Sequence, residues 1–182
     1  MDALQIVDCD FERHGLQMLA IVNDAIEHTT WVYDYQPRTA QAMAAYIDAR
    51  RSAGFPVIAA LDDRQALIGF GTFGPFRHLP GYKYTVEHSV FVEKSARRRG
   101  IGAQLLTRLI TLARDGEYHV MIGVIDSSNL ASMVMHESFG FECCGTLSEV
   151  GYKHGRWLDA VFYQLVLETP SNPVEPPRMG GA

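Results

Sequence analysis

The sequence has few of the residues that would build a disulfide framework or a metal site. Only three of its 182 residues are cysteines, and two of them, Cys143 and Cys144, are neighbours. Because a disulfide between adjacent residues is strained, we expect both to be reduced thiols on opposite faces of a strand, as in a cytoplasmic protein. The seven histidines contain no helical His-x-x-x-His pair, so we expect no metal.

Long apolar runs and strong positive charge are also lacking. No apolar run approaches the roughly 20 residues of a membrane span, and the N-terminus lacks the basic-then-apolar pattern of a signal peptide. The net charge is −5, and basic residues cluster at 97–99 instead of forming a broad stripe. We therefore expect neither nucleic acid nor a membrane as a partner.

What is present is typical of one globular domain, with 47% hydrophobic and 20% charged residues. We expect this domain to cover residues 1–168. Residues 169–182 carry four prolines and little that is apolar, which predicts a disordered tail.

The periodicity of apolar residues predicts an α/β fold of alternating strands and helices. Thr39 is expected to cap one of these helices, and residues 62–65 to form the turn of a hairpin. The predicted strands are 4–9, 57–61, 66–73, about 83–93, 119–125, 141–149 and 158–167. The predicted helices are about 11–28, 40–52, 101–115 and 128–138.

The most informative segment runs from Glu93 to Gly102, between an apolar strand and an amphipathic helix. Free N–H groups at a helix start, together with the positive end of the helix dipole, favour a bound phosphate. Gly100 and Gly102 let the backbone approach a ligand closely, where a Cβ would collide. The segment therefore predicts a phosphate-binding turn.

Two familiar phosphate-binding motifs do not fit. A Walker-type loop needs Lys and Ser or Thr after its last glycine, but Gly102 is followed by Ala103; a dinucleotide fingerprint needs a third glycine where Leu105 stands. Gly69–Gly74 matches that fingerprint in letters. Because Pro75 follows and no helix pattern opens there, we interpret it as a glycine-rich strand end.

The spacing Arg97-x-x-Gly100-x-Gly102 resembles the Gln/Arg-x-x-Gly-x-Gly/Ala signature of the GCN5-related N-acetyltransferases (GNAT), which cradles the pyrophosphate of acetyl-CoA. About 25 residues further on, the string from Asn129 to Phe141 resembles the family segment that lines the pantetheine arm. Two segments that match the same family, in the same order along the chain, are not expected by chance. The resemblance implies these cofactor-binding residues: Val90, Phe91, Val92, Arg97, Arg98, Arg99, Gly100, Ile101, Gly102, Ala103, Asn129, Ser132 and His136.

A narrower resemblance covers about residues 4–167. Thr85–Val92 and Glu149–Asp159 are similar to one subfamily, the phosphinothricin and methionine sulfoximine N-acetyltransferases, and residues 23–30 resemble its entry segment. The implied fold is the GNAT acyl-CoA N-acyltransferase fold of the α/β class. Its mixed, mostly antiparallel sheet is flanked by helices, and we expect its strands to splay between 87–92 and 120–125.

The implied activity is the transfer of an acetyl group from acetyl-CoA, a co-substrate, to the α-amine of a small amino acid or analogue. Methionine sulfoximine, methionine sulfone and phosphinothricin are the acceptors that the resemblance suggests, and a homodimer is the expected assembly. Two alternatives stay open. One is an enzyme that acetylates a protein N-terminus or a polyamine, and the other is a non-catalytic acyl-CoA-binding module.

The chemistry needs a base, because only a neutral amine attacks a thioester. The resemblance makes Glu87 that base, with Glu27 as a weaker helper; the alternative is a surface glutamate in an ion pair. The oxyanion needs preorganised donors, for which the backbone N–H groups of Val90 to Val92 are candidates. His136 stands where many relatives carry tyrosine. It either gives a proton to the thiolate, or contacts the cofactor, or is an ordinary satisfied helix histidine.

The negatively charged groups of the acceptor need a cationic partner. Arg77 lies on the loop before the Glu87 strand, and its guanidinium suits a carboxylate or phosphinate. Trp31, Tyr33 and Tyr35 either wall the pocket or pack into the core. The implied acceptor-binding residues are Glu27, Trp31, Arg77, His78, Leu79, Glu87, His88 and Ser89. Four residues are expected instead to tie the last strands and a dimer interface: Lys153, Arg156, Trp157 and Asp159.

Overall fold

The computed structural model describes residues 4–175 and confirms the α/β class. The strands are β1 (Gln5–Asp8), β2 (Val57–Leu61), β3 (Leu67–Pro75), β4 (Thr85–Val92), β5 (Val120–Asp126), β6 (Glu142–Lys153) and β7 (Arg156–Val166). The helices are α1 (Phe11–His28), α2 (Ala40–Ser52), α3 (Ile101–Asp115) and α4 (Leu130–Ser138), and single 3-10 turns lie at Pro80–Tyr82 and Lys94–Ala96.

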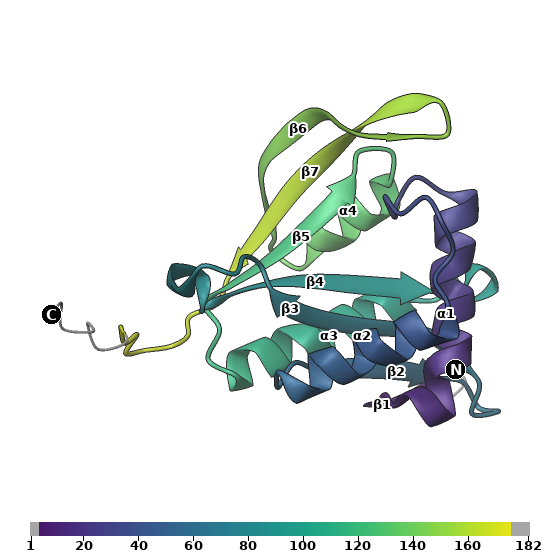
Figure 1. The fold of residues 1–182 in the computed structure, drawn as a ribbon. Helices are drawn as coiled ribbons and strands as arrows, with labels where there is room; N and C mark the ends of the chain where they lie inside the picture. Colours follow the sequence, from purple (N-terminus) through teal and green to yellow (C-terminus); the bar gives the residue numbers. More distant parts are fainter. Residues whose placement is uncertain (1–3, 176–182) are drawn as a thin grey trace, which may run out of the picture.

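The seven strands form one sheet in the order β1-β2-β3-β4-β5-β7-β6 (Figure 1). Only the β4–β5 pair is parallel, so the predicted mixed, mostly antiparallel sheet is confirmed. β4 and β5 pair only from Thr85–Glu87 to Val120–Ile122, and beyond these residues no strand pairing joins them. The expected splay is therefore present, and it opens at the C-terminal ends of both strands.

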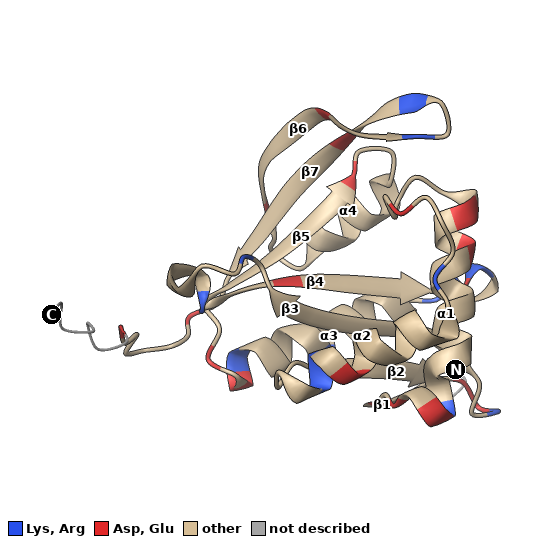
Figure 2. Ribbon diagram, in the orientation of Figure 1, with Lys and Arg blue, Asp and Glu red and all other residues tan. Residues whose placement is uncertain are grey.

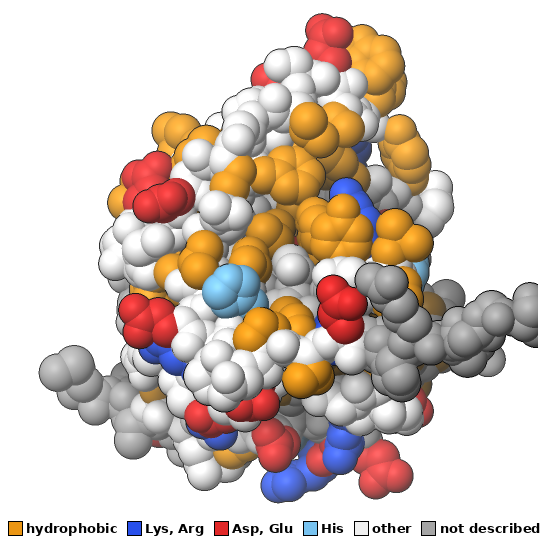
Figure 3. Space-filling model, turned by 90° about the vertical axis from the view of Figure 1, so that its left-hand side faces the viewer, with side chains coloured by type: hydrophobic (Ala, Val, Ile, Leu, Met, Phe, Trp, Pro, Cys, Tyr) orange, Lys and Arg blue, Asp and Glu red, His pale blue; other side chains and the backbone are white. Residues whose placement is uncertain are grey.

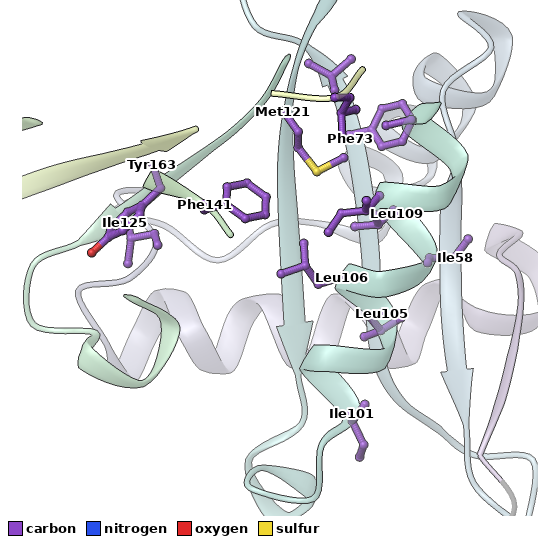
Figure 4. Packing of buried hydrophobic residues seen from close by; sticks show 14 of the residues in the cluster. Ile58, Phe73, Ile101, Leu105, Leu106, Leu109, Met121, Ile125, Phe141 and Tyr163 are labelled. Carbon is purple, nitrogen blue, oxygen red and sulfur yellow. The ribbon is translucent and has the colours of Figure 1, made fainter. Parts of the chain in front are cut away.

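The helices cover the two faces of this sheet. Along β2, Ile58 and Ala60 point into the core under α3, whereas Val57, Ala59 and Leu61 pack with α1 and α2. This alternation follows from the two-residue period of a strand. Figure 4 shows the α3 stripe of Leu105, Leu106 and Leu109 packed against side chains of the sheet. Charged residues are absent from β2 and β3 and lie mainly on helices and loops (Figure 2).

Helix starts follow the sequence closely. Thr39 caps α2, as predicted, by accepting a hydrogen bond from the Ala42 N–H at 3.1 Å. Asp10 caps α1 and Asn129 caps α4 in the same way. Helix α3 has no side-chain cap, and its N-cap residue is Gly100. Three helices are thus closed by side chains at their N-termini, and the helix of the predicted phosphate turn is not.

The last two strands were predicted too short, at 141–149 and 158–167. They continue to Lys153 and restart at Arg156, joined by a tight hairpin in which His154 and Gly155 both have positive φ. Two residues with positive φ form the turn that matches strand twist. Strand β6 is an edge strand with nearly every residue exposed, so it carries no apolar alternation from which its length could be predicted.

Cys143 and Cys144 are exposed free thiols beside a shift in the β6–β7 register. Of the predicted tail, residues 169–175 form no helix or strand, and the Val174 N–H donates to the Tyr84 hydroxyl at 3.0 Å; the rest lies outside the described residues. Within residues 4–175, no helix is long and apolar enough to cross a membrane. The same residues hold no group of three or more His, Cys, Asp or Glu side chains arranged for a metal ion.

Candidate active site

A cavity of about 580 Å³ lies in the splay between β4 and β5. It is bounded by the two strands, by α4, by the turn before α3, and by the start of the α1–α2 loop. Most predicted site residues line it: Trp31, His88, Ser89, Val90, Phe91, Val92, Arg97, Arg98, Gly100, Ile101, Gly102, Ala103, Asn129, Ser132 and His136. Six predicted residues do not: Glu27, Arg77, His78, Leu79, Glu87 and Arg99.

The turn at the mouth of the cavity has the geometry of an anion site. Gly100 adopts φ +77°, a left-handed conformation that favours glycine, and α3 begins directly after it. A Cβ on Gly102 would lie 3.3 Å from the Met135 sulfur, so this glycine also lets α3 and α4 pack closely. Because no side chain caps α3, its first N–H groups and its positive dipole end remain available to a phosphate.

Arg97 connects this turn to two neighbouring segments. Its Nε donates to the Val92 carbonyl at 3.1 Å, and its guanidinium lies 5.1 Å from the centre of the Trp31 ring. Cation–π contacts of this kind are worth about 0.5–1 kcal/mol at exposed sites. The contact brings the α1–α2 loop against the mouth of the cavity.

Strand β4 supplies backbone donors to the cavity. It pairs with β3 from Val86 to Val92, but with β5 only from Thr85 to Glu87. Beyond Glu87, the amides that point away from β3 have no strand partner. The oxyanion donors predicted among Val90 to Val92 therefore belong to a backbone segment that the splay leaves open.

Glu87 and His88 point to opposite faces of β4. Glu87 is half-buried on the α1–α2 side and does not line the cavity, although Ser89, on the same face two residues along, does. Burial raises the pKa of Glu87, while the positive charges of Arg77 and Arg50 oppose this shift. A carboxylate whose pKa is shifted by burial and by specific charged neighbours beside a cavity is a candidate for a functional role.

On the other face, two buried histidines meet. The His136 Nδ1 lies 2.7 Å from the Ser132 carbonyl, and because a carbonyl only accepts, this nitrogen carries the proton. The Nε2 of neutral His136 is then an acceptor, 3.1 Å from the His88 Nε2, which must donate. The geometry disfavours His136 as a proton donor to a thiolate, because its one N–H group is already bonded to the Ser132 carbonyl. Both ring nitrogens have partners, as in an ordinary satisfied helix histidine, and the side chain also lines the cavity, so a cofactor contact remains the other alternative.

The predicted acceptor loop is exposed. Arg77 donates weakly to the Phe76 carbonyl at 3.4 Å, and its guanidinium stacks 4.4 Å above the Phe76 ring. His78 and Leu79 are exposed beside it. Glu27 is also exposed, on α1. Arg77 is close enough to Glu87 for its charge to lower the pKa of that glutamate. None of the four side chains, Glu27, Arg77, His78 and Leu79, lies in the cavity wall.

The aromatic residues of the α1–α2 loop divide between two roles. Trp31 lines the cavity, which agrees with the first of its two alternatives, a place in the pocket wall and not in the core. The Tyr33 hydroxyl donates to the Asp159 carbonyl at 3.3 Å, and the Tyr35 hydroxyl to the Tyr152 carbonyl at 2.6 Å. Tyr33 and Tyr35 thus attach the loop to the β6–β7 hairpin, and neither lies in the cavity wall.

Lys153 also attaches the α1–α2 loop to the β6–β7 hairpin. Its side chain is buried, and Nζ donates at 2.6 Å to the carbonyls of both Ile26 and Val32. Asp159 accepts a hydrogen bond from the Glu149 N–H at 2.8 Å. These contacts support the structural role expected for the last strands, here as a clamp on the α1–α2 loop.

Several residues of the cavity were not predicted from the sequence. Ile21 and Ala25 of α1 form part of its wall, and so do Asp126 and Gly123 of β5. A Cβ on Gly123 would come within 2.9 Å of the His136 Nε2, so only glycine leaves room for the histidine pair. A lone glycine inside a strand is the available sequence signal, since it marks a close approach.

An open sheet that splays between two parallel strands, with an uncapped helix start at its mouth, defines an acyl-CoA-dependent N-acyltransferase. The chain belongs to the acetyltransferase (GNAT) family, whose sequence profile matches residues 21–141. Acetyl-CoA is the co-substrate of this family.

Individual relatives agree. The chain is 42% identical to the L-methionine sulfoximine/L-methionine sulfone acetyltransferase of Pseudomonas paraeruginosa, over 83% of this chain and 88% of the relative. It is 39% identical to the L-amino acid N-acyltransferase MnaT of Escherichia coli, over 84% and 88%. The crystal structure of a GNAT superfamily phosphinothricin acetyltransferase from Sinorhizobium meliloti, in complex with acetyl-CoA, superimposes with a TM-score of 0.90 at 29% identity, covering 96% of this chain and 94% of that one.

Proposed function

We propose that this protein transfers the acetyl group of acetyl-CoA to the α-amine of methionine sulfoximine, methionine sulfone or phosphinothricin. The observation that carries the proposal is the position of Glu87. It lies at the inner end of the splay, half-buried, next to the strand segment that leaves its backbone donors open. The names of relatives support these acceptors: one that is 42% identical is an L-methionine sulfoximine/L-methionine sulfone acetyltransferase, and one that is 31% identical is a phosphinothricin N-acetyltransferase.

The residues around the cavity fit acetyl-CoA. The first N–H groups of α3 and the guanidinium groups of Arg97 and Arg98 would hold the pyrophosphate. Asn129 and Ser132 line the cavity further in, where polar groups suit the amides of the pantetheine arm. The bound co-substrate supplies an activated acetyl thioester.

In the proposed reaction, Glu87 takes a proton from the acceptor ammonium, directly or through water. The freed nitrogen lone pair attacks the thioester carbonyl carbon, and the open amides of β4 stabilise the negative charge that forms on oxygen. The C–N bond forms, the C–S bond breaks, and the thiolate leaves and is protonated. The raised pKa of Glu87 makes its carboxylate a stronger base than an exposed glutamate.

We propose that the loop with Arg77, His78 and Leu79 binds the far end of the acceptor, and that Glu27 has at most a secondary role. A homodimer in the cytoplasm is part of this proposal. Exposed hydrophobic side chains support an interface: Leu147, Val150, Tyr152 and Trp157 on the β6–β7 hairpin are all about half-exposed. Figure 3 shows hydrophobic side chains gathered over the upper part of one face.

The test is thiol release from acetyl-CoA across a panel of acceptors. The panel holds the three amino-acid analogues, the common free amino acids, a peptide with a free N-terminus and a polyamine. We expect turnover with the analogues to exceed turnover with every other acceptor. Turnover confined to the peptide or the polyamine would replace the proposed function by one of the alternative acetyltransferase activities, and cofactor binding without any turnover would make the protein a binding module.

A further inference from the structure

The guanidinium of Arg50 lies over Gly74, at the place where another residue would have its side chain. A Cβ built on Gly74 would be 1.2 Å from the Arg50 Nη1, 2.4 Å from its Cζ and 3.2 Å from its Nη2, so its three nearest atoms all belong to this guanidinium. Arg50 comes from the last turns of α2, and Gly74 from the end of β3. Glycine at position 74 therefore makes room for this guanidinium.

That place is next to Glu87. Gly74 and Glu87 are direct partners in the antiparallel β3–β4 pair, so side chains at these two positions point to the same face of the sheet. The Cβ atoms of such partners are about 4.5–5.5 Å apart. Because its guanidinium occupies the Gly74 side-chain position, Arg50 reaches the immediate surroundings of the proposed base. The charge of Arg50 also acts on the pKa of Glu87.

The Arg50 guanidinium has unused hydrogen-bonding capacity. It stacks 5.2 Å from the centre of the Tyr46 ring, which fixes its direction, but none of its N–H groups donates a hydrogen bond within residues 4–175. No carboxylate of the described chain lies within 4 Å of it as an ion pair. A guanidinium is a planar donor that matches a carboxylate with two parallel hydrogen bonds.

An α-amino acid carries its amine and its carboxylate on the same carbon. When the amine faces Glu87, the carboxylate must therefore lie within a few ångströms of that glutamate. The cations whose charge lowers the pKa of Glu87 are Arg77 and, with a smaller effect, Arg50. Arg77 is exposed and donates to the carbonyl of its own neighbour, whereas Arg50 is partly buried and held over Gly74.

We propose that Arg50 binds the α-carboxylate of the amino-acid acceptor, a role that rests on the proposed function. Arg77 then remains for the acceptor's far end. A site of this kind selects free α-amino acids against peptides and polyamines, which present an α-amine or primary amine without an adjacent carboxylate. The substrate class of the site is thus the free α-amino acid, recognised by its α-amine at Glu87 and by its α-carboxylate at Arg50.

The experiment compares two acceptors that differ only in that charge, L-methionine sulfone and its methyl ester. The quantity measured is the ratio of kcat/KM for the acid to kcat/KM for the ester, at fixed pH and saturating acetyl-CoA. An effect of Arg50 on the basicity of Glu87 acts on both acceptors and cancels from the change in this ratio. Loss of a hydrogen bond between charged groups corresponds to about 10- to 150-fold.

We expect Arg50→Ala to lower the ratio by that factor and Arg50→Lys to recover only part of it. Gly74→Ala keeps the arginine but places a methyl group on its guanidinium, so we expect it to lower the ratio too. Arg51→Ala, a neighbouring exposed arginine, is the matched control and should leave the ratio unchanged. Circular dichroism melts establish that each variant is folded.

The outcomes separate the two proposals. An unchanged ratio in folded Arg50→Ala, or a wild-type protein that acetylates acid and ester equally well, overturns the carboxylate site and leaves the proposed function standing. A wild-type protein that acetylates neither acceptor overturns the proposed function, and the inference with it. A fall in the ratio for Arg50→Ala but not for Arg51→Ala supports both.

Discussion

His88 and His136 form a buried pair, with Nε2 atoms 3.1 Å apart and ring centres 5.0 Å apart. Burial and the neighbouring His136 lower the pKa of His88 to about 3, and burial lowers the pKa of His136 as well. Both rings are therefore neutral near pH 7. The His88 Nδ1 keeps a buried lone pair with no hydrogen-bond partner among the described residues, which leaves an acceptor beside the cavity.

The first prediction concerns stability at acid pH. Between about pH 3 and 6.5, the unfolded chain binds a proton at position 88 that the folded protein does not, so the free energy of unfolding rises with pH in this window and falls as the pH is lowered. From pH 6.5 to 5, one such histidine costs about 2 kcal/mol. His88→Gln keeps a donor for His136 but does not titrate, so its unfolding free energy should depend less on pH.

Urea unfolding at pH 7 and pH 5 measures this difference, with His119→Gln, an exposed histidine, as the control. Equal pH dependence in wild type and His88→Gln would show that His88 already carries a proton in the folded state. The neutral state assigned to this buried histidine would then be wrong.

The second prediction concerns the base. Glu87→Gln keeps the shape of the side chain but removes the proton acceptor, and loss of a general base typically lowers a rate by about 10²–10⁴. We expect kcat to fall by this factor while the affinity for acetyl-CoA, measured by calorimetry, stays the same, because Glu87 does not line the cavity. Glu27→Gln is the comparison, and a larger loss there than at Glu87 would transfer the role to α1.

Local parts of the site could be predicted because their causes are local. The β4–α3 turn needs only a residue that adopts positive φ and a helix directly after it. The sequence indicates both, with a glycine at position 100 and an amphipathic pattern that begins at Ile101. Most helices and strands were predicted correctly for the same reason, since apolar periodicity and capping residues lie within each segment. The hairpin at His154–Gly155 was missed because exposed β6 shows no such periodicity.

The remaining parts of the site depend on contacts between distant segments. His88 and His136 meet only because β4 and β5 separate and Gly123 leaves space between them. Arg50 comes near Glu87 only because its guanidinium occupies the side-chain position of Gly74, the β3 partner of Glu87. The spacing of residues along the chain does not show which distant side chains come into contact in the fold. The sequence therefore predicted the turn before α3 and the proposed base, but not the groups packed around them.

The third prediction tests the phosphate turn with a matched pair of variants. Asn and Asp both tolerate the left-handed conformation of Gly100, and a Cβ built there meets no atom within 4 Å. Gly100→Asp places a negative charge where the pyrophosphate is proposed to bind, whereas Gly100→Asn adds nearly the same volume without charge. Calorimetry with acetyl-CoA should show binding lost in the first variant and largely kept in the second.

Wild-type affinity for acetyl-CoA in both Gly100→Asp and Gly100→Asn would mean that no phosphate lies at this turn. Equal loss in both would mean that the volume of the side chain matters and its charge does not. In either case the electrostatic interpretation of the uncapped α3 start would be wrong.

The fourth prediction concerns Lys153, which joins the β6–β7 hairpin to the α1–α2 loop. Lys153→Met keeps the apolar stem but removes the ammonium, so the carbonyls of Ile26 and Val32 lose their shared donor. A buried acceptor left without a donor costs about 1–3 kcal/mol. We expect a lower melting temperature than for Arg64→Met, which removes an exposed cation from the β2–β3 turn. Because the clamped loop carries Trp31 into the cavity wall, the affinity for acetyl-CoA should fall as well. A Lys153→Met protein that melts and binds acetyl-CoA like Arg64→Met would show that the hydroxyls of Tyr33 and Tyr35 suffice to hold the loop.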